Sequence, residues 1–107
     1  MSSLLTPRAS SLLTQVAVTA DNVLTREDAG RLPSGTGGPI ARGEAQYHAL
    51  VSANKKESGD LTFKDLLLEE VHGALALEGG EGLRDRLVES AAILFAWVTV
   101  LDVRSTR

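Results

Sequence analysis

The sequence predicts an all-α protein, a small bundle of about four helices, from three observations. Apolar residues recur every three or four positions along four stretches of the chain, which is the period of one face of a helix. No stretch alternates apolar and polar residues over any length, as a half-buried strand would. Segments rich in glycine, proline or charge separate the four stretches, as connections between helices do.

Length and composition limit the class of protein. The 107 residues suffice for one domain, expected over residues 1–107 with residues 1–9 disordered, and the 43% of hydrophobic residues can form its core. The net charge of −3 offers no basic footprint for nucleic acid. The absence of cysteine excludes thiolate chemistry and fits a reducing cytoplasm. The longest apolar run, residues 91–98, is far shorter than the ~20 residues that span a bilayer. We therefore expect a cytoplasmic protein without a membrane partner.

The first helix is expected over residues 10–29, where Ser10 or Ser11 can cap it. Residues 30–43, GRLPSGTGGPIARG, contain five glycines and two prolines and are expected to form a loop. The SGTGG stretch could present backbone N–H groups to an anion, but no lysine follows the glycines as in a phosphate-binding loop. A linker is the favoured interpretation, and a ligand-binding loop is the alternative.

The second helix is expected over residues 41–56 and ends in a solvated turn at Lys55 and Lys56, where cations suit the helix dipole. Its predicted inner face consists of Tyr47, Leu50 and Val51. The third helix begins after Thr62, which forms a capping box with Asp65, and stops at the glycine pair of residues 79–80.

The fourth helix is expected over residues 82–103. Its apolar stripe consists of Leu83, Leu87, Ala91, Leu94, Phe95, Val98 and Leu101. Because the EGGEG connection is short, helices three and four should be antiparallel neighbours. Both helices also carry apolar residues off their main stripes, which predicts a second buried face and hence a homodimer.

Charged residues near the glycine turn suggest a functional site. On antiparallel neighbouring helices they converge at one seam, and they are Glu69, Glu70, Asp85, Arg86 and Glu89. A carboxylate that faces a core costs several kcal/mol unless it is paired or binds a cation. Acids from facing helices are how bundles hold divalent metals such as magnesium.

The pattern of a Thr/Asp-started helix with LLLEEV, a short Gly-rich turn and LRDRLVESAAILFAWVTVLD resembles the MazG-like nucleoside triphosphate pyrophosphohydrolases. The resemblance covers residues 33–104 and is strongest to the small actinobacterial and phage members of the family. It implies a helical bundle completed by dimerisation, and magnesium ions held by an E-x-x-E and a following E-x-x-D motif. The implied reaction converts a nucleoside triphosphate to a monophosphate and pyrophosphate through metal-activated water.

The four metal-ligand positions of the motif fall on Glu70, Gly73, Arg86 and Glu89. Two of them therefore keep a carboxylate, whereas glycine offers no side-chain ligand and arginine is a permanent cation. If the chain is active, the resemblance implies Glu69, Glu70 and Glu89 as catalytic residues. The implied magnesium ligands are then Glu70 and Glu89, with Asp85 as a further candidate.

We hypothesise that Arg86 replaces the metal and pairs with Glu70 or Glu69, which would leave nucleotide hydrolysis weak or lost. The alternative function is a non-catalytic helical module for protein interaction or regulation. Two other interpretations are weaker: solvated glutamates on an exposed helix face, and a di-iron E-x-x-H motif at Glu69 and His72. That motif should occur on two helices and occurs on one, so His72 is expected to be a surface or interface residue.

Overall fold

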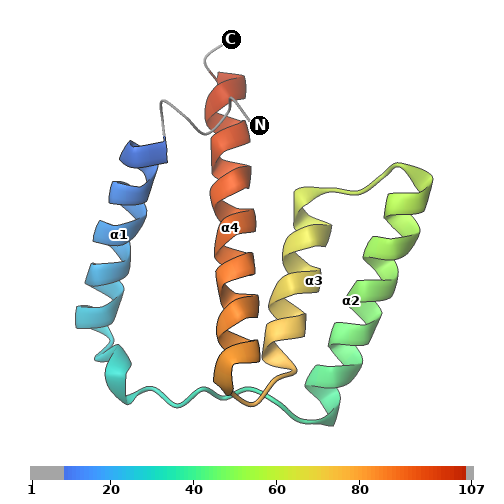
Figure 1. Cartoon of the computed structure of the whole chain (residues 1–107), viewed down its shortest axis with the longest axis horizontal. Helices are drawn as coiled ribbons and strands as arrows, with labels where there is room; N and C mark the ends of the chain where they lie inside the picture. Colours follow the sequence, from blue (N-terminus) through green and yellow to red (C-terminus); the bar gives the residue numbers. More distant parts are fainter. Residues whose placement is uncertain (1–8, 106–107) are drawn as a thin grey trace. The chain divides into compact units, whose positions relative to one another are not determined.

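The computed structural model describes residues 9–105, which form four α-helices and one 3-10 helix and contain no strand. The helices are α1 (Ala9–Arg26), α2 (Pro39–Ser58), α3 (Phe63–Leu75) and α4 (Gly80–Ser105), and the 3-10 helix is η1 (Ala29–Arg31) (Figure 1). The predicted all-α fold class is therefore confirmed. The expected disorder of residues 1–9 concerns residues outside the described range, except for Ala9, which is the first residue of α1.

The chain divides into two compact units. Unit 1 contains residues 1–33 and 98–107, and its described part holds α1, η1 and the last turns of α4. Unit 2 contains residues 34–97 and holds α2, α3 and the larger part of α4. The charged residues at the predicted seam all belong to unit 2.

Within unit 2, α3 and α4 run antiparallel, as the short connection predicts (Figure 1). Phe63 at the start of α3 stacks on Trp97, with ring centroids 5.8 Å apart. At the other end of α3, Glu70 lies near Arg86 in the second turn of α4. Contacts at both ends are possible because the two helices point in opposite directions.

The capping box at the start of α3 is confirmed. The Thr62 hydroxyl accepts a hydrogen bond from the Asp65 backbone N–H at 3.2 Å, and the Thr62 backbone N–H donates to the Asp65 carboxylate at 3.1 Å. These bonds satisfy donors that the first turn of a helix otherwise leaves free.

The predicted loop over residues 30–43 is too long, because η1 occupies its start and α2 begins at Pro39. Proline suits the first position of a helix, where its missing N–H is not needed. Gly38 precedes it with a φ of 101°, a conformation that favours glycine. The irregular connection between η1 and α2 is thus limited to residues 32–38.

The predicted inner face of α2 is wrong for Tyr47 and Leu50, each of which is 62% exposed. In its place α2 turns smaller and polar side chains toward α3, and Ser52 is 2% exposed. The Ser52 hydroxyl donates to the Asp65 carbonyl at 3.1 Å. A close approach of the two helices at this hydroxyl leaves no room for large apolar side chains.

Few apolar residues are buried in the described part of the chain. Ala74 in unit 2 is fully buried and Leu12 in unit 1 is 8% exposed, whereas many larger apolar side chains face solvent. Those on α4 are Leu87, Val88, Leu94, Val98 and Leu101. Exposed apolar surface on this scale is typical of an interaction surface.

Candidate functional site

The seam between α3 and α4 contains an ion pair. Arg86 Nη1 lies 3.6 Å from Glu70 Oε2, and the two side chains are 46% and 22% exposed. Glu70 is on the last two turns of α3, and Arg86 is near the start of α4, so the antiparallel arrangement brings them together. This is the pair that the sequence predicts for Arg86 with one of the two glutamates.

Gly73 makes the room for this arginine. A Cβ placed on Gly73 would overlap Arg86 Nη1 and would lie 2.9 Å from Cζ of the same guanidinium. The guanidinium therefore rests on the bare backbone of α3, one turn after Glu70. Gly73 and Arg86, at which the sequence differs from the magnesium motif that it resembles, thus form one structural arrangement, because the missing side chain at position 73 leaves the space that the arginine fills.

The other predicted site residues do not join this pair in one cluster. Glu69 is half-buried on α3, whereas Asp85 and Glu89 are exposed on α4. Within residues 9–105 no group of three histidine, cysteine or acidic side chains is arranged to hold a metal ion. The chemistry of the donor set also does not fit magnesium, which prefers several oxygen ligands. Here Gly73 has no side chain to offer, and Arg86 places a cation beside the Glu70 carboxylate.

A second polar cluster joins α2 to the start of α3, and its centre is the Asp65 carboxylate, 4% exposed. Lys55 Nζ lies 3.1 Å from Asp65 Oδ1, and the Thr62 hydroxyl donates to Oδ2 at 2.7 Å. The Thr62 hydrogen bond and Lys55 hold the pKa of Asp65 below its ordinary value, against the opposing effect of burial. Lys55 is therefore not the freely solvated residue that the sequence predicts.

The two histidines of the chain meet where α2 packs on α3. Their rings stack with centroids 4.2 Å apart and planes 13° from parallel. His72 Nδ1 also lies 3.4 Å from Glu44 Oε2, and its side chain is 19% exposed. His72 is thus mostly buried between α3 and α2, at an interface within the chain. The sequence predicts either a surface or an interface position for this residue.

The SGTGG stretch packs against the connection between α3 and α4. The Gly37 N–H donates to the Leu75 carbonyl at 2.7 Å, so this donor is already used. A Cβ on Gly37 would overlap the side chain of Glu78, an acid that repels anions. These contacts give Gly37 a packing role and support the linker interpretation.

Comparison of the chain with protein-family models, with curated proteins and with solved structures gave no match. The described helices include none that is both long enough and apolar enough to cross a membrane. The functional assignment therefore depends on the geometry of the chain itself.

Proposed function

We propose that this chain is a non-catalytic helical interaction module that associates with a second copy of itself. In this proposal it is a metal-free relative of the MazG-like pyrophosphohydrolases that its sequence resembles. Its Glu70–Arg86 pair takes the place of the magnesium ions of that family. The proposed location is the cytoplasm, in keeping with the cysteine-free sequence.

The observation that carries this proposal is the position of the Arg86 guanidinium. It rests on Gly73 and lies 3.6 Å from Glu70, where a divalent cation would need to bind. A fixed positive charge repels a divalent ion at this range even when the effective dielectric constant is ~20. Without bound magnesium, the triphosphate charge would be unbalanced and the attacking water would keep its ordinary, high pKa.

The exposed apolar surface supports association as the function that remains. Leucine and valine side chains are exposed on α1 and α4, while α2 exposes Ile40, Tyr47 and Leu50. A stable monomer seldom leaves so much apolar surface in water. The homodimer expected from the sequence would cover part of it.

Isothermal titration with magnesium and manganese, together with pyrophosphate release from a panel of nucleoside triphosphates, tests the proposal. The wild-type chain should neither bind these ions tightly nor release pyrophosphate. The double variant Arg86→Glu with Gly73→Glu, which restores all four acids of the motif, should gain metal affinity. Thermal shift with the same nucleotides separates nucleotide binding from no binding, since a ligand stabilises the state that it binds.

The competing function is the magnesium-dependent hydrolase with Glu69, Glu70 and Glu89 as catalytic residues. Tight magnesium binding by the wild-type chain that is lost in Glu70→Ala would establish a working metal site and overturn the proposal. Magnesium-dependent pyrophosphate release would do the same.

A further inference from the structure

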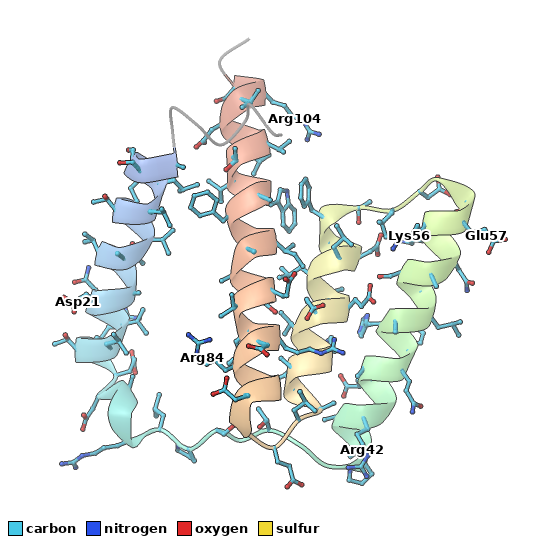
Figure 2. All side chains as sticks on the ribbon, in the orientation of Figure 1. Asp21, Arg42, Lys56, Glu57, Arg84 and Arg104 are labelled. Atoms are coloured by element: carbon cyan, nitrogen blue, oxygen red, sulfur yellow. The ribbon has the colours of Figure 1, made fainter. Side chains whose placement is uncertain are left out.

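We draw no further inference here: the strongest candidate, the surface patch of exposed apolar side chains Ile40, Tyr47 and Leu50 on α2 (the helix drawn in green shades in Figure 2), carries nothing, because the described part of the chain does not show what covers it.

Discussion

The Arg86 guanidinium covers the backbone of Gly73, so an α4 side chain occupies the space where α3 lacks one. This contact explains how a glycine can be accommodated in the last turn of α3 despite its low helix propensity. It also links the two residues energetically, because any side chain at position 73 must displace the arginine. Since Arg86 is 46% exposed and flexible, that displacement should cost little.

Gly73→Ala should therefore raise the free energy of unfolding. The increase should be smaller than the difference in helix propensity between alanine and glycine, which is about 1 kcal/mol. Gly43→Ala in α2 is the matched control, because a Cβ at that position meets nothing within 4 Å and should give the full gain. The difference between the two variants, from urea unfolding, measures the cost of moving Arg86. If Gly73→Ala gains as much as Gly43→Ala, the contact with Arg86 has no energetic weight.

The Glu70–Arg86 pair should contribute only about 0.2–1 kcal/mol, because both partners are partly exposed. A double-mutant cycle with Glu70→Gln and Arg86→Met measures the coupling free energy of this pair, separated from the effects that each substitution has elsewhere. The coupling should diminish at 1 M salt, where the Debye length is about 3 Å. A coupling well above this range that persists in high salt would mean that the pair is far less hydrated than the structure indicates.

Acid should destabilise the contact between α2 and α3 through Asp65. Hydrogen bonding to Thr62 lowers the pKa of Asp65 in the folded chain below the ordinary value of 3.8. The native state therefore binds this proton less readily than the unfolded chain. The resulting stabilisation is fully present above the unfolded pKa and is lost as pH falls through the folded value.

Urea unfolding at a series of pH values from 7 down to the acid transition measures this effect. The stability difference between wild type and Asp65→Asn should be greatest near neutral pH and should shrink below the ordinary pKa of the carboxyl. Thr62→Ala, which removes the strongest cause of the shift, should reduce the pH dependence and cost about 1 kcal/mol as a lost helix cap. An unchanged difference between wild type and Asp65→Asn across this range would contradict the assignment.

Local features of the fold could be predicted from the sequence where they depend on a few residues that are close together in the chain. The helix of α3 and its capping box follow from Thr62 and Asp65, three residues apart. The pairing of Glu70 with Arg86 also followed, because a short turn forces α3 and α4 to be antiparallel neighbours and leaves few choices of partner. The stop after residue 75 and the start at Pro39 differ from expectation by a few residues, as helix ends commonly do.

The contacts of α2 could not be predicted in the same way. Tyr47 and Leu50 are apolar and correctly spaced for an inner face, yet α2 packs through Ser52 and a histidine. Helical spacing identifies candidate faces but does not decide which of two faces meets a particular neighbour. The sequence likewise predicts a solvated Lys55, because its partner Asp65 comes near only when α2 and α3 pack together.

The stacking of Phe63 on Trp97 gives a direct optical test of the packing of α3 on α4. Trp97 is the single tryptophan of the chain and stacks on Phe63, so tryptophan fluorescence reports the surroundings of this one ring. Phe63→Ala should shift the emission to longer wavelength, because water gains access to the indole. Phe63→Ala should also lower the free energy of unfolding. An aromatic pair contributes about 0.5–1.5 kcal/mol, and the loss should be larger because buried apolar area is lost as well. Phe63→Leu, which keeps most of the apolar volume, should shift the emission less. Equal emission from the wild type and both variants would mean that the two rings are not in contact in solution.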